Sequence, residues 1–248
     1  MEVGIKMWST NPIKYIEDSD FADFIEVLPR SVKSLEKFAR RPYNYTVHVP
    51  HEIFGFSPIL NMKKSQKLLN QAIAAAKKLK AEVLIMHSGY LKEKPDEKTI
   101  KEGIRSVANL AKNASYGTVL IENSYPECFI ELEKGKYYLS YDYERLRELL
   151  ELSGAGFCLD FEHAAIAAHQ LGLDYNRYVA TLMKLEPEYF HLSGTSLASG
   201  KHHSTIFEGD IDLEFVKKIL KKANKPVCLE TPIDIEQRKR EVAFLKKV

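Results

Sequence analysis

The sequence alternates short apolar segments with longer amphipathic segments from one end to the other, and this alternation restricts the fold more than any other feature. Eight apolar segments have the length of β-strands, at residues 2–7, 24–28, 45–49, 82–86, 118–121, 156–159, 189–192 and 226–229. Helices are expected near residues 62–79, 97–112, 143–152, 162–171, 213–222 and 234–246, where apolar residues recur at helical spacing. The strand segments lack regular polar alternation, which is typical of parallel strands covered by helices.

Eight strand–helix units in 248 residues match the dimensions of a (β/α)8 barrel. A doubly wound parallel sheet is the alternative, but such sheets usually contain fewer strands. No linker or second hydrophobic pattern interrupts the chain, so we expect one TIM-barrel domain over residues 1–248. Two longer connections, residues 50–61 and 193–212, are expected to lie on the catalytic face.

Charge balance and cysteine content limit which binding partners and which cellular compartment we expect for this protein. The 36 Lys and Arg residues nearly balance the 34 Asp and Glu residues, which argues against a strongly basic nucleic-acid-binding protein but not against a local basic patch. The three cysteines are too few for a disulfide framework, and we find neither a signal peptide nor a membrane-spanning apolar run. We therefore expect a cytoplasmic protein without a membrane partner.

Side chains that can bind metal ions stand at the ends of six of the expected strands. They are His48, His87, Glu122, Asp160, His191 and Glu230. In a parallel barrel all strand ends of one kind meet at one mouth, so these side chains would form a ring. The carboxylates need neutralising positive charge, and few Lys or Arg residues stand at these strand ends. Nitrogen and oxygen ligands of this kind suit Zn²⁺, Mn²⁺, Co²⁺ or Fe²⁺.

The motifs around these residues resemble the xylose isomerase-like TIM barrels, the superfamily that joins endonuclease IV with sugar isomerases and epimerases. The resemblance covers nearly the whole chain. Its shared signature is a quartet after strands five to eight, which corresponds here to Glu122, Asp160, His191 and Glu230. The resemblance implies a (β/α)8 fold and a divalent metal ion bound by the quartet.

More specific motifs resemble endonuclease IV, the abasic-site endonuclease family. They are HVP at His48, HSG at His87, ENS at Glu122, DFEH at Asp160, ETP at Glu230 and KHHSTIFEGDI around His202. The resemblance implies three zinc ions. The first would be held by His48, His87 and Glu122, and the second by the quartet, with Glu122 bridging. The third would involve His163 and His202.

Two places depart from the endonuclease IV pattern. Gly200 stands where that family has the Asp of its third metal, and Glu208 and Asp210 are the nearby carboxylates that could replace it. His51 and Glu52 stand where that family inserts a Tyr-Leu wedge into DNA. We therefore expect two or three ions, with zinc the first choice and Mn or Co the alternatives.

Two enzyme classes fit these residues. The preferred one is a metal-dependent phosphodiester hydrolase whose implied substrate is abasic DNA, with Glu122 and His163 acting at the metals. Lys63, Lys64, Lys92, Lys94 and Lys201 are the candidates for contacts with DNA phosphates. The alternative is a one-metal sugar isomerase or epimerase, in which Glu122 and Glu230 move a proton between carbons of a small sugar. A noncatalytic metal-binding barrel is less favoured, since structural sites are closed and usually rich in cysteine.

Overall fold

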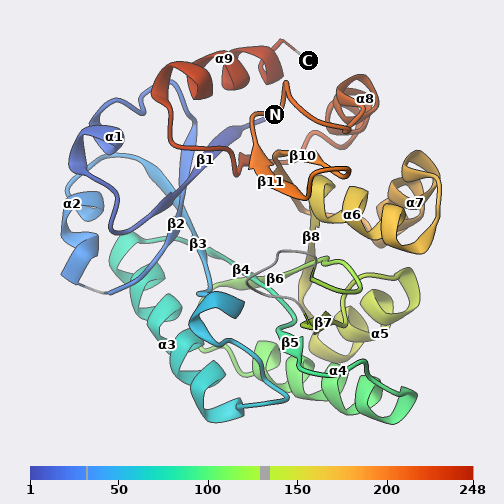
Figure 1. Ribbon diagram of the computed structural model, residues 1–248. Coiled ribbons are helices and arrows are strands. Elements are labelled where there is room, and N and C mark those ends of the chain that lie inside the picture. The colour runs from blue at the N-terminus through green and yellow to red at the C-terminus, as the bar shows by residue number, and fades with distance from the viewer. Residues whose placement is uncertain (32, 129–134, 248) are drawn as a thin grey trace.

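The computed structural model describes residues 1–31, 33–128 and 135–247 and contains a closed barrel of eight parallel strands (Figure 1). This confirms the expected (β/α)8 architecture. The strands follow one another around the barrel in chain order, and the last of them pairs with the first. They are β1 (Val3–Trp8), β2 (Phe24–Leu28), β3 (Asn44–His48), β4 (Val83–Met86), β6 (Thr118–Glu122), β8 (Gly156–Asp160), β9 (Tyr189–Leu192) and β12 (Val227–Leu229).

Helices form a ring around the outside of the barrel (Figure 1). The six expected helices are α3 (Met62–Leu79), α4 (Glu97–Lys112), α5 (Tyr143–Ser153), α6 (Phe161–Leu171), α8 (Leu213–Ala223) and α9 (Ile235–Leu245). The sequence pattern does not predict three shorter ones, α1 (Ile13–Glu17), α2 (Glu36–Ala39) and α7 (Tyr175–Leu182). Helical periodicity is hard to recognise over four to eight residues, which is why these helices escape it.

Side-chain caps set where most of the longer helices begin. Asn61, Asp96, Asp142 and Asp234 each accept a hydrogen bond from the backbone N–H three residues later, which satisfies a donor that has no partner inside the helix. Asp160 caps α6 in the same way. Helix α6 therefore begins directly where β8 ends, and its first turn lies at the mouth of the barrel.

Alternate strand positions fill the interior of the barrel. One buried cluster contains Phe24, Ile85, Leu120, Cys158, Tyr189 and Cys228. Two residues after each of these stand Glu26, His87, Glu122, Asp160, His191 and Glu230. Side chains at i and i+2 of a strand point to the same face, so the polar set forms the next layer toward the mouth. On β1 the corresponding pair is Gly4 and Lys6, and a Cβ on Gly4 would lie 2.2 Å from the Phe24 ring.

The longer connections at the carboxyl ends of the strands carry small elements of their own. Residues 50–61 contain a 3-10 turn, Glu52–Phe54, and residues 193–212 contain the antiparallel pair β10 (Gly194–Ser196) and β11 (Lys201–Ser204). A second pair, β5 (Tyr90–Leu91) and β7 (Tyr137–Tyr138), joins the connections after β4 and β6. Among the helices of the described ranges, none is long and apolar enough to cross a membrane.

Candidate metal centre

The six side chains at the strand ends meet at one mouth and form two overlapping clusters of candidate ligands. One cluster contains His48, His87 and Glu122. The other is the quartet of Glu122, Asp160, His191 and Glu230. Within each cluster the candidate ligand atoms lie within 4.8 Å of one another, a separation that one ion can span. Glu122 belongs to both clusters.

Glu122, at the carboxyl end of β6, lies between three imidazole rings. Its Oε2 is 3.2 Å from His48 Nε2, 3.0 Å from His87 Nε2 and 3.3 Å from His191 Nδ1. Burial raises the pKa of the Glu122 carboxyl, but the neighbouring His87 and His191 lower it well below its usual range. Glu122 is therefore a carboxylate, and its place between the two clusters suits a ligand shared by two ions.

The rings of His48 and His87 are oriented through their second nitrogens. His48 Nδ1 donates to the Val49 carbonyl oxygen at 2.8 Å, and His87 Nδ1 lies 3.0 Å from both carboxylate oxygens of Glu52. Each Nε2 is thus left to face Glu122. Burial and the charge of Lys6 lower the pKa of His48 to about 4, so this ring is neutral, whereas Glu52 and Glu122 raise the pKa of His87 well above its ordinary value despite burial. Carbonyl and carboxylate partners of this kind are typical of metal-binding histidines.

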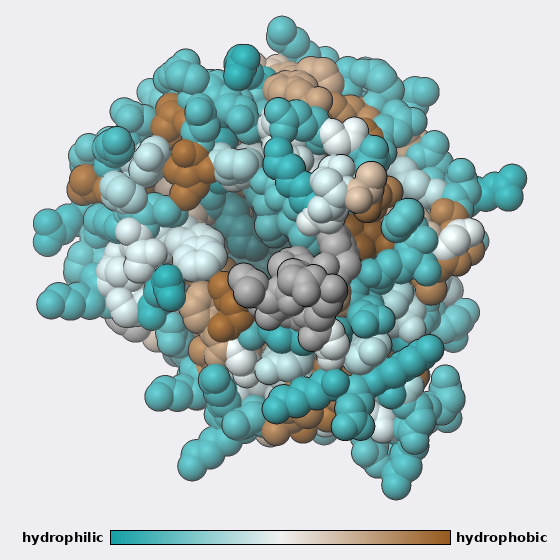
Figure 2. Space-filling model, in the orientation of Figure 1, coloured by the Kyte–Doolittle hydropathy of each residue, from teal (hydrophilic) through white to brown (hydrophobic). Residues whose placement is uncertain are grey.

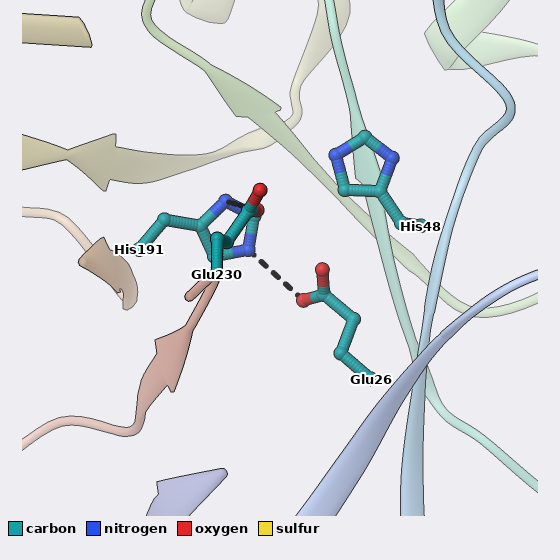
Figure 3. Close-up of side chains that lie close together, drawn as sticks. All are labelled: Glu26, His48, His191 and Glu230. Carbon is teal, nitrogen blue, oxygen red and sulfur yellow. Dashed lines mark hydrogen bonds and ion pairs between the residues drawn. The ribbon is translucent and has the colours of Figure 1, made fainter. Parts of the chain in front are cut away.

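Glu26 is a buried carboxylate in the middle of β2 that the strand-end pattern does not predict. Its Oε2 lies 2.9 Å from His191 Nε2 (Figure 3) and accepts a hydrogen bond from the Tyr189 hydroxyl at 3.0 Å. His191 Nδ1 is thereby directed to the quartet, 2.8 Å from Glu230 Oε1. Glu26 also forms a four-residue cluster of candidate ligands with His48, His191 and Glu230. The sequence feature that could have identified Glu26 is its position as the one charged residue in the apolar segment FIEVL.

The two carboxylate oxygens of Asp160 have different roles: one caps helix α6 and the other faces the quartet. Oδ1 accepts the α6 capping hydrogen bond from the His163 N–H at 2.7 Å. Oδ2 lies 3.9 Å from His191 Nδ1, and in the described part of the chain this buried oxygen has no hydrogen-bond partner. Buried polar atoms are almost always satisfied in native proteins. A divalent cation among the three carboxylates and one imidazole of the quartet would satisfy it, so the donor set fits a metal ion.

Lys6 adds a positive charge that an inspection of strand ends misses, because it lies inside β1, opposite Glu26 in the strand register. Its Nζ is 2.6 Å from Glu230 Oε1 and 3.6 Å from Glu26 Oε1. Burial lowers the pKa of Lys6, but Glu230 and Glu26 raise it above its ordinary value, so the side chain is an ammonium. A metal ion is therefore not the sole source of positive charge that these carboxylates can use.

His163 and His202 reach the mouth without joining a cluster. His163 Nδ1 lies 2.9 Å from the Asn123 carbonyl oxygen and 3.0 Å from Glu122 Oε1. Burial lowers the pKa of His163, but Asp160 and Glu122 raise it to about 9. His202 Nδ1 lies 3.2 Å from Glu162 Oε1. Within residues 1–31, 33–128 and 135–247, no group of three candidate ligands contains either histidine.

The two carboxylates considered as replacements at the third metal position are engaged elsewhere. Glu208 is exposed and pairs with Lys201 at 3.1 Å. Asp210 Oδ2 accepts a hydrogen bond from the Leu197 N–H at 2.7 Å. Within the described residues, neither carboxylate therefore joins a group of three candidate ligands.

A cavity of about 390 Å³ lies at this mouth, and Figure 2 shows a hydrophilic hollow at the centre of the same face. Lys6, His87, His163 and Glu230 contribute polar groups to its lining. Apolar contributions come from Trp8, Ile53, Pro232 and Ile233. The volume falls in the range of small-ligand sites, and polar groups beside an apolar wall are typical of them.

The family model described as xylose isomerase-like TIM barrel matches residues 13–248 of the chain. The chain belongs to this family. A protein of Mycobacterium leprae named probable endonuclease 4 is 25% identical over 264 residues, which cover 100% of this chain and 98% of that protein.

Two solved structures share the fold at low identity. A D-tagatose 3-epimerase-like protein has a TM-score of 0.73 and 17% identity, and the match covers 100% of this chain and 99% of the other. Endonuclease IV from Thermus thermophilus has a TM-score of 0.68 and 19% identity, with coverage of 100% and 98%. Proteins with both kinds of name thus share this xylose isomerase-like barrel.

Glu52 has an unexpected place in this xylose isomerase-like barrel. It stands at one of the two positions compared with the DNA wedge, yet it is 5% exposed and contacts His87 from inside the mouth. His51 Nδ1 lies 3.2 Å from the same carboxylate, and His51, Glu52 and His87 form a further cluster of candidate ligands. These two residues therefore belong to the polar centre of the mouth rather than to a projecting wedge.

Proposed function

We propose that this protein is a divalent-metal-dependent phosphodiester hydrolase that binds two ions, zinc being the first choice and Mn or Co the alternatives. The observation that carries the proposal is the pairing of His48 with His87 beside Glu122. Their Nε2 atoms lie 3.2 and 3.0 Å from one oxygen of Glu122, and Glu122 is also a member of the quartet. A one-metal enzyme does not require this additional set of nitrogen ligands.

Two bound ions would hold phosphoryl oxygens and activate a water molecule for attack on phosphorus. The residues of the chain support this chemistry in distinct ways. Glu122 would be a ligand at both positions because it belongs to both clusters, while Glu52 and Glu26 orient the rings of His87 and His191. His163 lines the cavity, and its Nδ1 lies 2.9 Å from the Asn123 carbonyl oxygen. Its position at the cavity wall places the ring within reach of a bound substrate.

Abasic DNA is the specific substrate that the relatives favour. The Mycobacterium leprae relative carries the name probable endonuclease 4. A DNA substrate is also supported by exposed lysines near the carboxyl ends of the strands, which could contact DNA phosphates. They are Lys63, Lys64, Lys92, Lys94 and Lys201. The cavity of about 390 Å³ has room for an extruded sugar with its phosphate.

Metal analysis of protein purified without chelator, paired with cleavage of a duplex containing one abasic site, tests the proposal. We expect two equivalents of metal per chain, cleavage at the abasic site, and no cleavage of the matched intact duplex. Chelation should abolish cleavage and added metal should restore it. One equivalent of metal together with an uncut abasic duplex would contradict the proposal.

A sugar isomerase or epimerase is the second candidate, and the quartet supports it. One ion bound there would stand beside Glu122 and Glu230, two carboxylates that can serve as general base and acid on a sugar. The cavity volume and its apolar wall are compatible with a monosaccharide. Conversion of a ketose by protein that holds one ion would favour this candidate over the hydrolase.

A further inference from the structure

The ammonium group of Lys6 is held at the mouth of the barrel beside the candidate metal ligands. The Lys6 side chain is 10% exposed, lines the cavity and lies 2.6 Å from Glu230 Oε1. Glu26 Oε1 is further away, at 3.6 Å, and so contributes charge without a hydrogen bond. Lys6 is thus almost entirely buried, and its remaining exposure is toward the cavity.

The ammonium group of Lys6 has more N–H donors than hydrogen-bond partners. An ammonium group has three N–H donors, and among the described residues Lys6 Nζ makes one hydrogen bond, to Glu230. Solvent in the open cavity can accept from the remaining donors. A substrate that displaces this solvent must provide an acceptor itself, because a buried donor without a partner destabilises the complex.

A second buried cation at the cavity, Arg238, provides a useful contrast. Its nitrogens donate to the backbone carbonyl oxygens of Lys6, Thr231 and Pro232. All three nitrogens of Arg238 thus donate to backbone carbonyl oxygens, and Arg238 holds β1 against the segment after β12. Lys6 differs because its backbone is held by Arg238 while its own charged group remains directed toward the cavity.

We propose that Lys6 binds a phosphoryl oxygen of the substrate next to the metal centre. A divalent ion at the quartet would share the charge of Glu230, which leaves the ammonium less neutralised and better able to attract an anion. A neutral sugar hydroxyl could accept a hydrogen bond but would not use this charge. The proposal rests on the proposed function for the metal site and names the group of the substrate that Lys6 recognises.

Calorimetric titration of inorganic phosphate into the zinc-loaded full chain tests the proposal, with metal content measured on every variant. Lys6→Met removes the charge while keeping most of the side-chain volume. We expect it to retain the metal content of the unmodified protein and to bind phosphate about 10- to 100-fold more weakly, the loss typical of a charged hydrogen bond. Lys6→Arg, which keeps the charge, should lose less.

Lys246→Met is the matched control, because Lys246 also forms an ion pair but does so at Asp23, at the opposite end of the strands. It should bind phosphate like the unmodified protein. Equal phosphate affinity in Lys6→Met and the unmodified protein would overturn the proposal. Absence of phosphate binding by the unmodified protein would also overturn it. Loss of metal from both Lys6 variants would do the same, since Lys6 would then act on the metal site alone. Lys6-dependent phosphate binding without phosphodiester cleavage would reject the hydrolase and leave the role of Lys6 standing.

Discussion

Replacing His87 with alanine should remove one ion from the centre and leave the other bound. His87 Nε2 lies 3.0 Å from Glu122 Oε2 and is one of three candidate ligands in its cluster, with His48 and Glu122. The quartet does not include His87, so all four of its members remain in the variant. The two ion positions should therefore respond differently to one substitution.

The size of the effect follows from the number of ligands. Structural zinc sites with four protein ligands bind with about 10–16 kcal/mol, or roughly 2.5–4 kcal/mol per ligand. Loss of one ligand should thus weaken the first ion about 100- to 1000-fold. Glu52 would also lose its contact with His87 and keep the one with His51, at 3.2 Å. A loss of about 1–3 kcal/mol in the free energy of unfolding is expected from that buried carboxylate.

Metal counting on the unmodified protein and on His87→Ala, with phosphodiester cleavage measured in parallel, provides the assay. His51→Ala is the control, because it also removes a partner of Glu52 but does not belong to the cluster that contains Glu122. We expect two equivalents for the unmodified protein and His51→Ala, and one for His87→Ala with cleavage reduced by orders of magnitude. Two tightly bound ions in His87→Ala would refute the two-cluster reasoning.

Three further predictions concern neighbouring residues. Glu26→Gln should weaken metal binding at the quartet by about 10- to 100-fold, since it disturbs the partner that orients His191; competition with a chelator measures this. In metal-free protein the raised pKa of His163, about 9 against an ordinary 6.5, stabilises the fold fully below pH 6.5. Its contribution disappears as the pH rises through 9, so the melting temperature of chelated protein should fall over that interval. Gly4→Ala should destabilise the fold by about 1–3 kcal/mol in denaturant unfolding, because its Cβ would lie 2.2 Å from the Phe24 ring; an unchanged midpoint would reject this.

The sequence by itself determined the barrel and the set of polar strand ends. Eight apolar segments separated by amphipathic ones leave few architectures, and a parallel barrel necessarily brings all carboxyl ends of its strands to one mouth. For that reason His48, His87, Glu122, Asp160, His191 and Glu230 could be grouped from the sequence. The grouping needed topology alone, and the structure places these residues in overlapping clusters.

The tertiary structure alone decided which other charges share that mouth and how each ring is oriented. Lys6 and Glu26 lie inside strands, and only the register that sets them opposite each other shows that both face the barrel interior. Glu52 lies in a loop whose path brings it 3.0 Å from His87. His163 and His202 have the residue type of a ligand, yet within the described residues no group of three candidate ligands includes either of them. Such contacts depend on distances of a few ångströms between segments far apart in sequence, which periodicity and motif spacing do not encode.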